Sequence, residues 1–179
     1  MTYRVGPLRA SDAGTLGPLH NRLWRETYSG LLPAHVLGAR DDADSTRRWF
    51  ERGVAHERWG VGVEGAITWV ARDDDQNPVG WLTVGPGRDA SPPVPTEIWS
   101  LYVAPERQGK GVARKLLQHL PADRAAYLWV LSGNDRAIAF YRSVGFETDG
   151  ATKDFEGLDA LELRMLRRLS NIAGGRATR

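Results

Sequence analysis

The sequence contains no cysteine, which excludes disulfide frameworks, thiol nucleophiles, zinc ribbons and redox dithiols. Long hydrophobic runs are absent too, since none approaches the roughly 20 residues that a membrane-spanning helix needs. Residues 1–12 lack the apolar region of a signal peptide, and the four histidines show no metal-ligand spacing. We therefore expect a soluble, cytoplasmic protein that holds no metal.

An excess of charge of one sign is also missing. The chain has 24 Lys+Arg against 22 Asp+Glu, a formal net charge of +2, and no basic stripe interleaved with aromatics. We therefore expect neither a nucleic-acid nor a membrane partner. A chain of 179 residues, with its 20 glycines and 10 prolines spread along it, suits one domain. We expect that domain over residues 1–169, with residues 170–179 as a disordered tail.

Hydrophobic periodicity predicts strands that alternate with helices. The expected helices run from a cap at Ser11-Asp12-Ala13 to about Tyr28, over about 42–54, from 113 to about 120, and from Asn134 to Gly145. Strands are expected near 3–8, 68–75, 79–85, 97–103 and 127–131, followed by two strands around Gly157. This order implies an α/β fold in which a mixed sheet carries helices on its faces.

A glycine-containing turn, Gln108–Lys115, leaves one of these strands and starts a helix. Such a turn points free N–H groups at one spot, where the helix dipole favours a phosphate. A plain turn with a solvated basic face explains the segment equally well. ATP and dinucleotide motifs are excluded, because no Gly-Lys-Ser/Thr occurs and Arg114 stands where the third glycine of G-x-G-x-x-G belongs.

Two motifs resemble the signature of the GNAT superfamily, the acetyl-CoA-dependent N-acetyltransferases. The first, L-Y-V-A-P-E-R-Q-G-K-G-V-A-R-K-L-L, matches [QR]-x-x-G-x-[GA] at Gln108, Gly111 and Ala113. The second, N-x-x-A-I-x-F-Y-x-x-x-G-F, is carried by Asn134, Ala137, Phe140, Tyr141, Gly145 and Phe146. The two motifs stand in the family's order and on the expected elements. The resemblance implies a mostly antiparallel sheet of about six to seven strands, splayed between the fourth and fifth.

The same resemblance implies where acetyl-CoA binds as co-substrate. Its pyrophosphate would lie on the amides of the turn, and its pantetheine beside the strand that ends at Val103. A main-chain N–H near Val103 would polarise the thioester carbonyl. The expected cofactor-binding residues are Leu101, Tyr102, Val103, Arg107, Gln108, Gly109, Lys110, Gly111, Val112, Ala113, Arg114, Asn134, Ala137 and Tyr141.

Catalysis needs a group that protonates the thiolate and one that helps the amine lose its proton. By resemblance, Tyr141 is the expected acid, and Glu97 stands where histone-type members carry a catalytic glutamate. A water chain in place of Glu97 remains an alternative. Trp24 and Tyr28 are the expected acceptor-binding residues, although a tryptophan on a helix face is more often part of a core.

The resemblance thus implies an N-acetyltransferase that moves acetyl from acetyl-CoA to an amine of a small molecule or peptide. The amine would attack directly in a ternary complex, with no covalent intermediate. The alternatives are transfer from another acyl-CoA and a non-catalytic, regulatory CoA-binding domain. A homodimer is one assembly that the resemblance leaves open.

Overall fold

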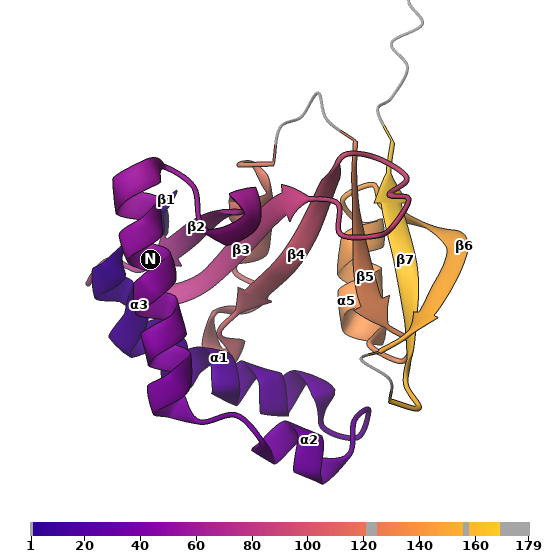
Figure 1. Cartoon of the computed structure of the whole chain (residues 1–179), viewed down its shortest axis with the longest axis horizontal. Coiled ribbons are helices and arrows are strands. Elements are labelled where there is room, and N and C mark those ends of the chain that lie inside the picture. Colours follow the sequence, from indigo (N-terminus) through magenta and orange to yellow (C-terminus); the bar gives the residue numbers. More distant parts are fainter. Residues whose placement is uncertain (1, 121–124, 156–157, 169–179) are drawn as a thin grey trace, which may run out of the picture.

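The computed structural model describes residues 2–120, 125–155 and 158–168, which form one seven-stranded sheet (Figure 1). Its strand order is β1-β2-β3-β4-β5-β7-β6, and all neighbours are antiparallel except the parallel pair β4 and β5. This confirms the expected mixed, mostly antiparallel sheet. The strands are β1 (Arg4–Pro7), β2 (Ile67–Arg72), β3 (Pro78–Pro86), β4 (Thr96–Val103), β5 (Ala126–Leu131), β6 (Glu147–Asp154) and β7 (Leu161–Arg167).

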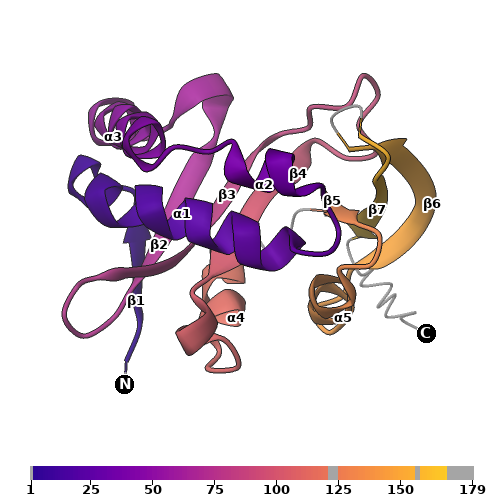
Figure 2. The same cartoon turned by 90° about the horizontal axis from the view of Figure 1, so that it is seen from below.

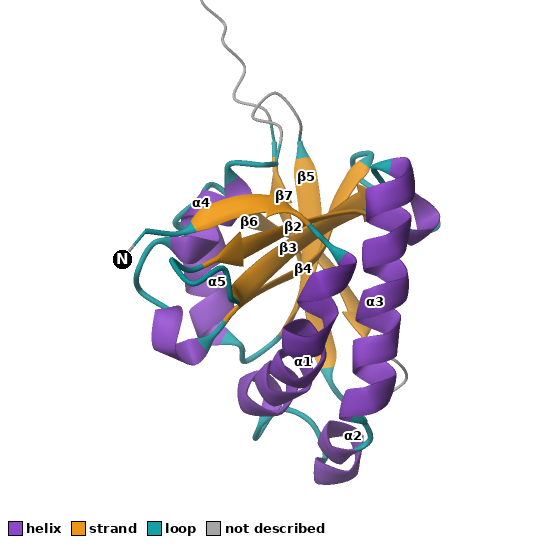
Figure 3. Cartoon of the chain, turned by 90° about the vertical axis from the view of Figure 1, so that its left-hand side faces the viewer, coloured by secondary structure: helices purple, strands orange, loops and turns teal. Residues whose placement is uncertain are grey.

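Helices cover both faces of the sheet. Figure 2 shows α1 and α3 on one face, with α4 and α5 on the other, and Figure 3 shows α1 and α3 side by side. Separate apolar clusters fill the two interfaces. No helix in the described ranges is long and apolar enough to cross a membrane. The helices are α1 (Ala13–Tyr28), α2 (Ala34–Gly38), α3 (Asp42–Trp59), α4 (Val112–Leu117) and α5 (Asp135–Arg142), with 3-10 turns η1 (Ala10–Asp12), η2 (Val63–Gly65) and η3 (Pro105–Arg107).

The helices differ from the sequence prediction in four places, one of which is α5, expected to run to Gly145 but ending at Arg142. The helix expected over 42–54 continues to Trp59, where Gly60 at φ 72° ends it. The helix expected to reach about residue 120 ends at Leu117. Helix α2 was not predicted, because five residues are too few to show a hydrophobic period. Gly157 and the expected tail over 170–179 lie outside the described residues.

Asp12, expected to help cap α1, has a different function. Its side chain makes no cap hydrogen bond to α1. Instead the buried carboxylate accepts bonds from Arg72 Nε at 3.0 Å, Arg72 Nη2 at 2.5 Å and the backbone N of Arg9 at 2.8 Å. Asp12 therefore ties the start of α1 to β2.

Strands β4 and β5 pair at one end and part at the other. Their parallel register runs only from Thr96↔Ala126 to Ile98↔Leu128. The next residue, Trp99, is a bulge, because Thr83 pairs with Ser100 while Val84 pairs with Ile98. A bulge bends its strand and re-aims it, and here it lies where β4 leaves β5. The expected splay between the fourth and fifth strands is confirmed, and we call it the β4–β5 opening (Figure 1).

Candidate active site

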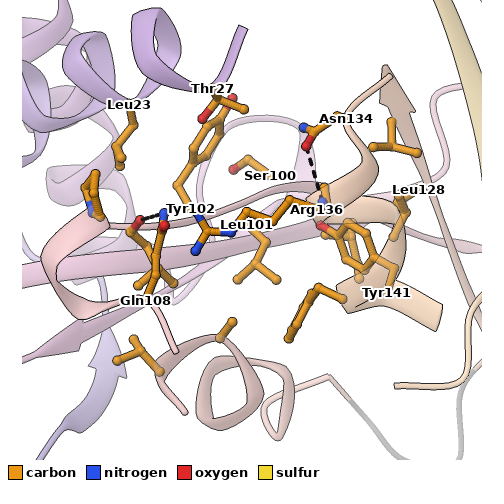
Figure 4. A pocket seen from close by; sticks show the side chains of 18 of the residues that line it. Leu23, Thr27, Ser100, Leu101, Tyr102, Gln108, Leu128, Asn134, Arg136 and Tyr141 are labelled. Carbon is orange, nitrogen blue, oxygen red and sulfur yellow. Dashed lines mark hydrogen bonds between the residues drawn. The ribbon is translucent and has the colours of Figure 1, made fainter. Parts of the chain in front are cut away.

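A cavity of about 660 Å³ lies at the β4–β5 opening. Its walls are the parted strands, the turn before α4, the inner side of α5 and the C-terminal half of α1 (Figure 4). Every residue expected to bind the cofactor lines this cavity except Lys110. The structure thus brings the two sequence motifs together at one site.

The turn before α4 presents backbone N–H groups that are available as hydrogen-bond donors. Gly109 and Gly111 adopt φ values of 72° and 80°, a left-handed backbone that favours glycine. The backbone N–H groups of residues 109–114 meet no acceptor among the described residues. The side chain of Gln108 holds the turn against β4, because its Nε2 donates to Val103 O at 2.8 Å. The turn therefore offers a row of amides to a ligand.

Three arginines add positive charge to the cavity wall: Arg107, Arg114 and Arg136. Arg107 Nη2 also lies 3.3 Å from Asp73 Oδ2, which fixes it beside the β2–β3 turn. Asp73 accepts bonds from the backbone of that same turn, so it organises the turn instead of facing solvent. The lining thus suits an anion.

Tyr141 lies on α5, whose first turn is capped by Asn134. Asn134 Oδ1 accepts from Ala137 N at 3.2 Å, as the capping prediction required, and Asn134 lines the cavity as well. The Tyr141 ring packs against Phe140 and Phe146, with centroids 5.5 and 5.6 Å away. Burial raises the pKa of the Tyr141 phenol above its ordinary value, so the hydroxyl keeps its proton at neutral pH. It can therefore act as a proton donor.

The structure does not bring Glu97 into this cavity. Glu97 lies where β4 and β5 are still paired, and it is only 1% exposed. Its carboxylate accepts from Arg88 Nη2 at 2.5 Å, from Arg88 N at 2.8 Å and from the Tyr127 hydroxyl at 3.0 Å. Burial raises the pKa of Tyr127 to about 12, which keeps that donor protonated. Glu97 therefore fastens the β3–β4 loop to the sheet.

The two residues expected to bind the acceptor have different surroundings. Tyr28 lines the cavity, and its hydroxyl lies 3.1 Å from that of Tyr102 on β4. Trp24 is buried and is not part of the cavity wall. Its ring packs against Tyr28, with centroids 4.7 Å apart, and the guanidinium of Arg40 lies 3.7 Å from its centroid. Trp24 thus supports the wall that Tyr28 forms.

Sequence reasoning missed an α1 surface that faces the cavity, made of Leu23, Glu26 and Thr27. Their i, i+3, i+4 spacing places them on one side of the helix, and this signal was readable in the sequence. It also missed Trp129, which lines the cavity from β5. No group of three or more metal-ligating side chains occurs within the described ranges.

Known proteins resemble this chain in sequence and in fold. A family model described as an acetyltransferase (GNAT) domain matches residues 64–148. The probable N-acetyltransferase Rv2775 of Mycobacterium tuberculosis is 26% identical over 163 residues, which cover 89% of this chain and 88% of that protein. The N-alpha-acetyltransferase RimI of the same organism is 38% identical over 80 residues, which cover 41% of this chain and 51% of that protein.

Among solved structures, the PaiA N-acetyltransferase of Thermoplasma acidophilum in complex with coenzyme A has the same fold. It aligns with a TM-score of 0.71 and 18% identity over 94% of this chain and 99% of that chain. The family match falls on the segment that contains β4, the turn and α5. Residues 64–148 of this chain thus resemble a GNAT acetyltransferase domain, and the fold is that of a solved N-acetyltransferase.

Proposed function

We propose that this enzyme transfers the acetyl group of acetyl-CoA to a primary amine by direct attack in a ternary complex. The observation that carries the proposal is the cavity at the β4–β5 opening. Free amides line one part of it, and a buried, protonated Tyr141 lines another. An anionic carrier can therefore be held at the turn while its reactive end reaches the tyrosine.

Acetyl-CoA fits the residues present. A Cβ atom built on Gly109 or Gly111 would meet nothing within 4 Å, so the space over the turn is open to a pyrophosphate. The arginines of the cavity wall would add to the amides there. Between Trp99 and Val103 the β5-facing edge of β4 pairs with no strand among the described residues, which leaves backbone groups for the amides of the pantetheine arm.

The chemistry then needs no covalent enzyme intermediate. The uncharged amine attacks the thioester carbonyl carbon, a C–N bond forms, and the C–S bond breaks. A main-chain N–H of the Trp99–Val103 edge stabilises the oxyanion, and the Tyr141 hydroxyl gives its proton to the departing sulfur. The proton that the nitrogen loses after bond formation restores the Tyr141 phenol.

A peptide with a free N-terminal amine is the first acceptor to test. The relative that supports this choice is RimI, an N-alpha-acetyltransferase by name. Small-molecule primary amines are the second class of acceptor to test, and together with the peptides they form the amine panel. Because the chain has no cysteine, a thiol reagent detects released CoA without any signal from the enzyme.

Ligand binding tests the cofactor half of the proposal. Acetyl-CoA and CoA at about 100 times Kd should stabilise the protein by roughly 2.7 kcal/mol in a thermal shift assay, and ATP and NAD should not. Gly111→Glu should abolish that shift, because a carboxylate would occupy the anion's place. Gly150→Glu is the matched control: Gly150 also has a positive φ, 90°, with nothing within 4 Å, but lies on β6 away from the cavity. No shift with either CoA species would contradict the proposal.

Kinetics tests the acid. Tyr141→Phe keeps the ring packing but removes the hydroxyl, so kcat should fall by about 10²–10⁴-fold while the KM for acetyl-CoA changes little. The control Tyr127→Phe also removes a buried hydroxyl, the one bonded to Glu97, and should leave kcat near the wild-type value. Unchanged turnover in Tyr141→Phe would refute the acid role of Tyr141. A comparable loss of kcat in Tyr127→Phe would indicate that Glu97, the partner of the Tyr127 hydroxyl, takes part in the reaction.

A further inference from the structure

Three hydroxyl groups from distant parts of the chain meet at the cavity: Tyr28 of α1, Tyr102 of β4 and Tyr141 of α5. Burial raises the pKa of Tyr102 and of Tyr141, and the neighbouring Tyr28 raises both further. The phenols of Tyr102 and Tyr141 therefore stay uncharged at neutral pH. They can donate hydrogen bonds, but they provide no charge opposite to that of an ammonium ion.

An amine acceptor arrives mostly as an ammonium ion, and the arginines of the cavity wall repel it. Arg107, Arg114 and Arg136 suit the phosphates of a carrier, so the acceptor needs a separate, negative part of the cavity. Glu97 does not provide it, because its carboxylate lies outside the cavity and already accepts from two side chains.

Glu26 meets this requirement. Among the described residues that line the cavity, it carries the one carboxylate. It lies on α1 three residues after Leu23 and next to Thr27, both of which face the cavity in Figure 4. Within the described part of the chain, no cation pairs with Glu26 and no hydrogen bond engages its side chain. Its neighbour on the helix, Arg22, is instead 3.1 Å from Glu106.

We propose that Glu26 is the acceptor-binding residue, which recognises the ammonium group of the incoming amine. This inference rests on the proposed acetyl transfer and names the acceptor class: cationic primary amines. The carboxylate draws the ammonium to the α1 side of the cavity, opposite the turn that holds the phosphates. From there the nitrogen loses one proton to solvent water, since Glu26 is exposed, and then attacks the thioester.

The test compares Glu26→Gln with wild type on the peptide and small-amine panel, with CoA release as the readout. Losing one charge-assisted hydrogen bond should lower kcat/KM for the amine by about 10- to 100-fold, mostly through KM. Binding of acetyl-CoA, measured by the thermal shift, should not change. Raising the salt concentration should weaken amine binding in wild type and have less effect in the variant. Glu26→Asp should recover part of the loss.

Glu106→Gln is the matched control, because it removes a nearby exposed carboxylate that does not line the cavity. It should leave the amine KM unchanged. An unchanged amine KM in Glu26→Gln, or an equal rise in both variants, would overturn the assignment of Glu26 even if acetyl transfer occurs. Failure of the proposed function itself differs from this, because wild type would then acetylate no amine in the panel or fail to bind CoA.

Discussion

Acid should destabilise this fold through His20, a histidine of α1 held in an aromatic pocket. Its ring lies 5.9 Å from Trp49, 5.1 Å from Trp81 and 5.6 Å from Tyr102, measured between centroids. Its Nε2 lies 3.3 Å from Nη1 of Arg40, which can only donate, so Nε2 accepts and is unprotonated. Protonating the ring would remove that bond and put a cation beside an arginine.

The size of this acid destabilisation follows from the pKa of His20 in the folded protein. Burial, and then the positive charges of three nearby arginines, lower the pKa of His20 from 6.5 to about 3. As the pH falls below 6.5, His20 therefore becomes protonated in the unfolded chain but stays neutral in the folded one. The stability from His20 is complete above pH 6.5 and is lost progressively toward pH 3. Between pH 7.5 and 5.5 this linkage removes about 1.4 kcal/mol from the free energy of unfolding.

Urea unfolding followed by tryptophan fluorescence at the two pH values measures this loss. His20→Gln keeps an acceptor for Arg40 but has no titrating ring. The pKa values of His56 and His119 are also lowered by burial, and both residues are present in wild type and variant alike. The wild type should thus lose about 1.4 kcal/mol more than the variant between pH 7.5 and 5.5. Equal losses in both proteins would refute the reasoning.

Two further predictions concern stability, each measured by urea unfolding at pH 7.5. Gly53→Ala should cost about 1–3 kcal/mol, because its Cβ would lie 2.5 Å from the Cα of Ala10. Gly14→Ala, with nothing within 4 Å, should cost nothing, and equal effects would show that α3 tolerates displacement. Asp12→Ala should cost about 3–5 kcal/mol by leaving the buried guanidinium of Arg72 unpaired. Adding Arg72→Met should restore part of that loss, and a single-variant cost below about 1 kcal/mol would contradict this account.

The sequence was a good guide to the cavity residues of the turn and of α5, because these segments are built locally. The turn is a contiguous segment, and Asn134 caps the short helix that carries Tyr141, so their spacing predicted which residues lie together. It was a poorer guide to the rest of the cavity wall, where Tyr28 lies as expected but Glu97 does not. The resemblance suggested Glu97 or a water chain as the base. The loop whose Arg88 binds the Glu97 carboxylate is an irregular segment without periodicity, so this contact could not be predicted.

By itself, the sequence determined the order of strands and helices, the glycine-containing turn between β4 and α4 and the cap of α5. These features depend on side-chain periods and backbone preferences over a few residues. Tertiary structure decided where β4 and β5 part, which carboxylate is buried and which one faces the cavity. The opening depends on a bulge at Trp99 against β3, and the placement of Glu26 depends on how α1 packs across the sheet. Such outcomes follow from contacts between segments far apart in the chain, which no local pattern encodes.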